Sequence, residues 1–110
     1  MSLRVLVVED DRGFRAVLAR YLGRRGDTVH EAGSLEEARA VLATEPVDVV
    51  LADIGLPDGL GLDLAEREVP PVVLMTADGT VENAVSALHL GVVDFLVKPF
   101  EFEQLEAALR

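Results

Sequence analysis

Carboxylates, a hydroxyl and an ammonium stand directly after apolar runs of this sequence, where they could act together. The set comprises Glu9, Asp10 and Asp11 after "LRVLVV", Asp53 after "VDVVLA", Thr76 after "VVLM" and Lys98 after "DFLV". Lys98 is the only lysine among ten basic residues. Carboxylates about 4 Å apart repel by roughly 4 kcal/mol at an effective dielectric constant of about 20. If these acids cluster, we expect Lys98 to supply one balancing charge and a hard divalent ion the rest.

Phosphoryl transfer is a chemistry that uses every member of this set. Mg²⁺ takes oxygen ligands in octahedral geometry and is typically held by one or two carboxylates plus a phosphate. A carboxylate beside such an ion can act as a nucleophile and accept a phosphoryl group as an acyl phosphate. The metal, Lys98 and the Thr76 hydroxyl could each neutralise the transferred group. Each residue also has a structural explanation, as a helix cap, a turn former or a strand end, but these explanations leave the grouping unaccounted for.

Alternating strands and helices would bring these side chains to one edge of a sheet. Apolar and β-branched runs predict five strands, at Leu3–Val8, Asp27–Ala32, Val47–Ala52, Val72–Met75 and Val93–Val97. Amphipathic spacing and capping signals predict helices at Arg12–Arg24, from the Ser34 cap to Ala43, from about Gly61 to Glu68, at Val81–Leu90 and from Glu101 onward. This order predicts a doubly wound α/β fold, with a parallel sheet covered by helices on both faces. Ligands of such sheets bind beyond the carboxyl ends of the strands, which is where the polar set falls.

Length and composition limit the other functions of this chain. The 110 residues contain no internal repeat, so we expect one domain over residues 1–110. Acidic residues outnumber basic ones by 20 to 10, which argues against direct binding of nucleic acid. The absence of cysteine excludes thiolate chemistry, and His30 and His89 lack partners at ligand spacing. No apolar stretch approaches the roughly 20 residues of a membrane span, so we expect a soluble cytoplasmic protein without membrane contact.

Four motifs in this order resemble the receiver domain of bacterial two-component response regulators, the CheY-like family. They are "VLVVEDD", "DVVLADIGLPDG", "VVLMTAD" and "DFLVKPF", and they span nearly the whole chain. The resemblance implies a flavodoxin-like fold with five parallel strands in the order 2-1-3-4-5. It also implies that the domain takes a phosphoryl group from a sensor histidine kinase or a phosphotransfer protein.

The resemblance further implies roles for the residues of the polar set. Asp53 matches the phosphoacceptor of the family. Glu9 and Asp10 match the acidic pair that holds Mg²⁺, with Asp10 as a direct ligand and Mn²⁺ as an alternative ion. Asp53 itself and the backbone carbonyl of Gly55 would be the other protein ligands. Lys98 matches the lysine that pairs with the phosphoryl group.

A conformational switch is also implied by the resemblance. Thr76 matches the hydroxyl that turns toward the phosphoryl group, Phe95 the aromatic residue that swings inward, and Pro99 a proline that is often cis in the family. The face of the fourth helix, fifth strand and fifth helix would be remodelled and would control an attached output domain, for which we expect a transcription regulator. The same face is a candidate homodimer interface. Leu90, Phe95 and Phe102 belong either to this face or to the core.

Two structural features depart from the family's pattern. The segment from Gly61 to Thr76 is several residues short, which leaves room for little more than two turns of helix. Leu60 stands where the family often has an acid, so we expect the usual N-cap to be missing, at a cost of roughly 1 kcal/mol.

The chain ends at Arg110 inside the predicted last helix, so we expect a truncated helix and a fragment of a longer regulator.

Gly55 bears on the fate of the acyl phosphate and on the alternative functions. Gly55 offers no steric shield, so we expect ready hydrolysis of Asp53 phosphate, with Asp78 modulating the rate. A phosphatase with an aspartyl-phosphate intermediate would need a second acid at position 55. We therefore expect no enzyme activity beyond Mg²⁺-dependent self-phosphorylation and autodephosphorylation. The remaining alternative is a receiver-like module that binds proteins independently of phosphorylation, and Mg²⁺ binding would discriminate between the two.

Overall fold

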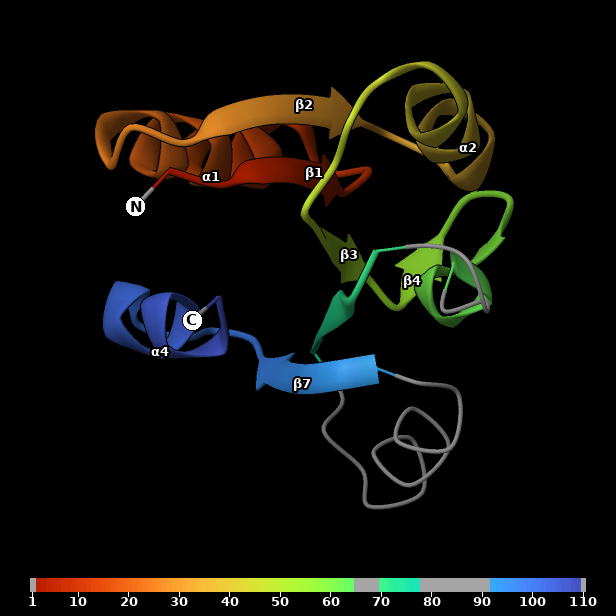
Figure 1. Cartoon of the computed structure of the whole chain (residues 1–110). Coiled ribbons are helices and arrows are strands. Elements are labelled where there is room, and N and C mark those ends of the chain that lie inside the picture. The colour runs from red at the N-terminus through yellow and green to blue at the C-terminus, as the bar shows by residue number, and fades with distance from the viewer. Residues whose placement is uncertain (1, 65–69, 78–91, 110) are drawn as a thin grey trace.

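A five-stranded parallel sheet forms the centre of the molecule. The computed structural model describes residues 2–64, 70–77 and 92–109 (Figure 1). The strands are β1 (Arg4–Val8), β2 (Thr28–Ala32), β3 (Val49–Asp53), β6 (Val72–Thr76) and β7 (Val92–Val97), in the spatial order β2-β1-β3-β6-β7. Every neighbouring pair in this sheet is parallel. In chain order these strands are 2-1-3-4-5, so the predicted flavodoxin-like α/β fold is confirmed.

Helices cover both faces of this sheet. The described helices are α1 (Arg12–Arg24), α2 (Leu35–Thr44), the 3₁₀ helix η1 (Gly61–Leu64) and α4 (Phe102–Ala108). α1 and α4 bury Leu18 and Leu105 in one core cluster, and α2 and η1 bury Leu35 and Leu64 in another. Figure 1 shows the two layers on opposite sides of the strands. β3 is buried between them from Val49 to Ala52, which explains its unbroken apolar sequence.

Side-chain caps fix where the helices begin. The Asp11 carboxylate accepts a hydrogen bond from the Phe14 N–H at 3.1 Å, so α1 starts directly after the acidic run that follows β1. Ser34 caps α2 by accepting from the Glu37 N–H at 3.2 Å, as the Ser34 and Glu37 spacing predicts. The boundaries between β1 and α1 and between β2 and α2 are therefore set by local polar residues, and α1 holds the acidic run close to the sheet.

The loop after β3 differs from the sequence prediction. Gly55–Leu56 (β4) and Gly59–Leu60 (β5) form a two-stranded antiparallel hairpin where no strand was predicted. The hairpin is possible because Gly59 takes a φ of 150°, which glycine adopts readily. The predicted helix from Gly61 to Glu68 begins as the 3₁₀ helix Gly61–Leu64, and residues 65–69 lie outside the described part. The predicted helix Val81–Leu90 also lies outside it.

Asp58, at the turn of this hairpin, ties the loop after β3 to α2. One carboxylate oxygen accepts from the Leu35 N–H at 2.8 Å and the other from the Glu36 N–H at 3.0 Å. Both donors belong to the first turn of α2, where backbone N–H groups have no partner within the helix. These hydrogen bonds lower the pKa of Asp58 below its ordinary value. The hairpin that follows β3 is therefore anchored to the first turn of α2.

We predict that Asp58→Ala lowers the stability of the domain in a pH-dependent way. Because the pKa of Asp58 is depressed in the fold, its contribution is present above the unfolded value of about 3.9 and is lost as the pH falls through the folded value. Urea unfolding followed by circular dichroism should give a lower midpoint for Asp58→Ala at pH 7 and a narrowing difference below about pH 4. Glu36→Gln removes a charge from the same helix turn and is the matched control. An equal difference at every pH would contradict the prediction.

Candidate functional site

The ends of four parallel strands bring the predicted polar residues together. Glu9 follows β1, Asp53 ends β3, Thr76 ends β6 and Lys98 follows β7. The register pairs Thr76 with Val97, and the Lys98 N–H donates to the Thr76 carbonyl at 2.7 Å, which continues the pairing past the end of β7. These side chains, separated by up to 89 positions in the sequence, are therefore neighbours at the carboxyl edge of the sheet.

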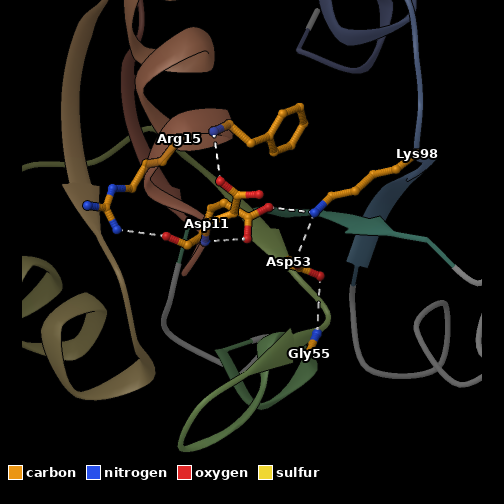
Figure 2. Close-up of polar contacts among 7 residues, drawn as sticks. Asp11, Arg15, Asp53, Gly55 and Lys98 are labelled. Atoms are coloured by element: carbon orange, nitrogen blue, oxygen red, sulfur yellow. Dashed lines mark hydrogen bonds and ion pairs between the residues drawn. The ribbon is translucent and has the colours of Figure 1, made fainter.

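Lys98 bridges two carboxylates from different strands. Its Nζ lies 2.5 Å from Glu9 Oε1 and 2.9 Å from Asp53 Oδ2. Figure 2 shows the Lys98 side chain extended toward Asp53, with Gly55 on the other side of that carboxylate. The Gly55 N–H donates to Asp53 Oδ1 at 3.2 Å. Both oxygens of Asp53 are thus held in place, while 15% of its side-chain surface stays exposed to solvent.

Burial and neighbouring charges shift the pKa values of Glu9 and Lys98. Burial raises the pKa of Glu9, the neighbouring Asp53 carboxylate adds to the increase, and the Lys98 ammonium and the Asp11 N–H act against it. For Lys98, burial alone would lower the pKa, but the hydrogen bonds to Glu9 and Asp53 outweigh burial and raise the pKa above its ordinary value. The ammonium is therefore charged at neutral pH and offsets part of the negative charge of the cluster.

The acidic residues of this edge fit a divalent metal ion. Glu9, Asp10 and Asp53 each offer a carboxylate oxygen, and these oxygens lie within 4.8 Å of one another. Opposite oxygens around an octahedral ion with bonds of 2.0–2.1 Å are about 4.2 Å apart. Small movements of the three side chains are therefore enough to place their oxygens around Mg²⁺. Among the described residues this group offers carboxylate oxygens alone, and such hard donors favour Mg²⁺, Mn²⁺ or Ca²⁺ over zinc.

Of the other predicted site residues, Thr76 ends β6, Phe95 lies on β7 and Pro99 follows Lys98. Thr76 is buried, with 1% of its surface exposed, at the end of β6. Phe95 is partly buried against the cluster on the α2 side of the sheet. The Lys98–Pro99 peptide bond is cis. Asp78 lies outside the described residues, and so does Leu90. Phe102 is 41% exposed and stacks on Tyr21 of α1 at a ring distance of 4.0 Å.

Three residues at the site were missed by the sequence analysis. The Phe14 ring lies 4.7 Å from Lys98 Nζ in a cation–π contact, and Arg15 donates to the Glu9 backbone. Their position in the sequence could have indicated this, because a helix that starts directly after the acidic run must place its first turn beside that run. Gly61 was taken only as a helix start. A Cβ there would lie 2.0 Å from the backbone oxygen of Asp53, so only glycine fits.

Comparisons with known proteins identify the family. The response regulator receiver domain family matches residues 5–110, so the chain belongs to it. The response regulator protein PilR of Pseudomonas aeruginosa is 39% identical over 107 residues, which cover 93% of this chain and 24% of PilR. The KDP operon transcriptional regulatory protein KdpE of Escherichia coli is 36% identical over 110 residues, covering 96% of this chain and 49% of KdpE. The chain thus spans about a quarter to a half of these curated relatives.

Solved structures agree with this assignment. A response regulator from Burkholderia pseudomallei, with a phosphorylated aspartic acid, a calcium ion and citrate, superposes with a TM-score of 0.90 at 29% identity, covering 98% of this chain and 66% of that one. A response regulator receiver protein from Pseudomonas putida gives 0.90 at 34% identity, covering 99% and 96%. The predicted membership of the receiver family is confirmed. In the part of the chain that is described, no helix has the length and apolar character to cross a bilayer.

Proposed function

We propose that this receiver domain is a phosphorylation switch in which Asp53 accepts a phosphoryl group from a sensor histidine kinase or a phosphotransfer protein. The observation that carries the proposal is the bridge from Lys98 Nζ to both Glu9 and Asp53. The bridge holds two carboxylates and a compensating cation at one partly exposed edge, which supports Asp53 as the nucleophile and Glu9 as a further acidic residue for a metal. The phosphorylated aspartate of the Burkholderia pseudomallei relative supports the same chemistry.

The geometry suggests how Asp53 reacts. One of its carboxylate oxygens attacks the phosphorus, an O–P bond forms, and the P–N bond of the donor phosphohistidine breaks with its electron pair returning to the ring nitrogen. The Lys98 ammonium, 2.9 Å from Oδ2, offsets negative charge on the carboxylate before the reaction and on the phosphoryl oxygens after it. The Gly55 N–H, 3.2 Å from Oδ1, orients the carboxylate before attack. No oxidant or reductant is needed.

The metal in this proposal is Mg²⁺, with Mn²⁺ as an alternative. When bound, it supplies charge neutralisation for the phosphoryl oxygens during transfer. Asp10 and Asp53 would hold it directly, Glu9 would support them, and the Gly55 carbonyl would be a backbone ligand. The carboxylate spacing at this edge supports the assignment.

Phosphorylation would then act through the switch residues. The Thr76 hydroxyl would turn toward the phosphoryl group, and Phe95 would move inward, which is a population shift driven by contacts made only in the phosphorylated state. We propose that the remodelled face controls an attached output domain and offers a homodimer interface. Transcription regulation is the process we favour, because relatives such as KdpE are named as transcriptional regulators.

Intact-mass measurement after incubation with acetyl phosphate and Mg²⁺ tests this function. The wild type should gain one phosphoryl group, and Asp53→Asn should gain none. Asp48→Asn is the matched control, since Asp48 directly precedes β3 while Asp53 ends it, and it should gain the group normally. A folded wild type that gains no mass and binds no Mg²⁺ would favour the phosphorylation-independent binding module instead.

We also propose that Gly55 and Asp78 set the lifetime of the acyl phosphate. A Cβ at Gly55 would meet no atom within 4 Å, so a larger side chain fits there without disturbing the fold. Gly55→Asn should lengthen the half-life of Asp53 phosphate several-fold by restricting the approach of water, and Asp78→Ala should change it as well. The half-life is read from the decay of the phosphorylated mass after removal of the donor. A half-life that neither substitution changes would rule the proposal out.

A further inference from the structure

Arg15, in the first turn of α1, reaches back to the acidic run from its far side. Its Nη1 donates to the backbone carbonyl of Glu9 at 2.8 Å, and its Nε pairs with Glu31 Oε1 at 3.2 Å. The Arg15 side chain is 18% exposed, so most of it is packed rather than solvated. Figure 2 places Arg15 on the side of this run away from Lys98. The guanidinium therefore contacts the backbone whose carboxylates face the candidate metal site.

The segment from Glu9 to Asp11 is held at both of its ends. The Glu9 N–H donates to the Ala32 carbonyl at 2.9 Å, which extends the pairing of β1 with β2 by one residue. The Arg15 N–H donates to the Asp11 carbonyl at 2.9 Å, while the guanidinium of the same residue holds the Glu9 carbonyl. Asp10 lies between these two anchors. The direction of its carboxylate therefore depends on a backbone to which Arg15 donates two hydrogen bonds, one from its main chain and one from its side chain.

Gly33 leaves the space that the guanidinium occupies. A Cβ on Gly33 would lie 2.8 Å from Arg15 Nη1, closer than real Cβ contacts allow. The φ angle of Gly33 is not in the positive range, so alanine is compatible with its backbone. Replacing Gly33 by alanine would therefore push the guanidinium off the Glu9 carbonyl without removing Arg15. The chain thus offers a way to break the contact from the opposite side.

The partner Glu31 is of smaller consequence. Its side chain is 47% exposed, and an ion pair with so exposed a partner contributes little. The Glu9 backbone, by contrast, is buried, with 1% of the residue exposed, and a buried carbonyl deprived of its donor is costly. The hydrogen bond to the carbonyl is therefore the contact that matters for the site, and the ion pair to Glu31 orients the guanidinium.

We propose that Arg15 is a positioning residue for the acidic pair, holding the Glu9–Asp11 backbone in the geometry that binds the divalent ion. This inference rests on the proposed function, because it concerns the same metal site. Outer groups that orient metal ligands typically change metal affinity by about 10- to 100-fold when removed. Arg15 acts through the backbone and touches neither the phosphoryl group nor Asp53.

Mg²⁺ titration by calorimetry on the whole 110-residue chain tests the proposal. Arg15→Met keeps the aliphatic bulk and removes the donors, and it should weaken Mg²⁺ binding by about tenfold. Gly33→Ala should weaken it in the same direction, Arg15→Lys should recover part of the loss, and Glu31→Gln should stay within about twofold of wild type. In the metal-free protein, Arg15→Met and Gly33→Ala should shift the backbone amide signals of Asp10 and Asp11, whereas Glu31→Gln should leave them nearly unchanged.

The rate of phosphorylation by acetyl phosphate separates positioning from a general loss of structure. Arg15→Met should raise the Mg²⁺ concentration at half-maximal rate while the rate at saturating Mg²⁺ stays close to that of the wild type. Mg²⁺ binding by folded Arg15→Met and Gly33→Ala within twofold of wild type would overturn the inference and leave the proposed function intact. Asp10→Asn, which removes a proposed ligand, shows what lost Mg²⁺ binding looks like in the titration. A wild type that likewise binds no Mg²⁺ would overturn both the inference and the proposed function.

Discussion

The arrangement of this site depends on one interaction, the bridge from Lys98 Nζ to Glu9 and Asp53. It joins the end of the edge strand β7 to the ends of β1 and β3, which lie farther into the sheet. Without a cation, acids gathered at this edge would repel each other strongly. The bridge also explains why residue 98 is a lysine and not an arginine, because a compact ammonium on a flexible stem fits between two carboxylates where a planar guanidinium needs a wider approach.

Much of the fold could be predicted because the polar and apolar residues follow simple periodic rules. The five strands and the capped starts of α1 and α2 follow from apolar runs, Asp11 and Ser34. The hairpin Gly55–Leu60 and the 3₁₀ turn that follows it could not be predicted, because they depend on tertiary contacts. One such contact is the pair of hydrogen bonds that Leu35 and Glu36 of α2, 23 and 22 positions away, donate to Asp58.

The site shows the same division between what is local and what is not. Parallel strand ends place Glu9, Asp53 and Lys98 together once the sheet is known, so these residues follow from their position in the sequence. Arg15 and Gly61 do not, because their importance comes from close contact with a backbone carbonyl. The Arg15 guanidinium donates to the Glu9 carbonyl, and a Cβ at Gly61 would collide with the Asp53 carbonyl. An ordinary arginine on a helix and a glycine in a loop carry no signal of such contacts.

The side-chain amine of Lys98 offers the most direct test of this account. Since Lys98 is the only lysine, protein labelled with ¹⁵N at lysine Nζ gives a single side-chain signal that needs no assignment. If Lys98 bridges Glu9 and Asp53, its pKa lies above the ordinary lysine value of about 10.4, it falls in Glu9→Gln and Asp53→Asn, and the signal shifts when Asp53 is phosphorylated. A signal with an ordinary pKa that does not respond to either substitution or to phosphorylation would show that Lys98 does not join these strands.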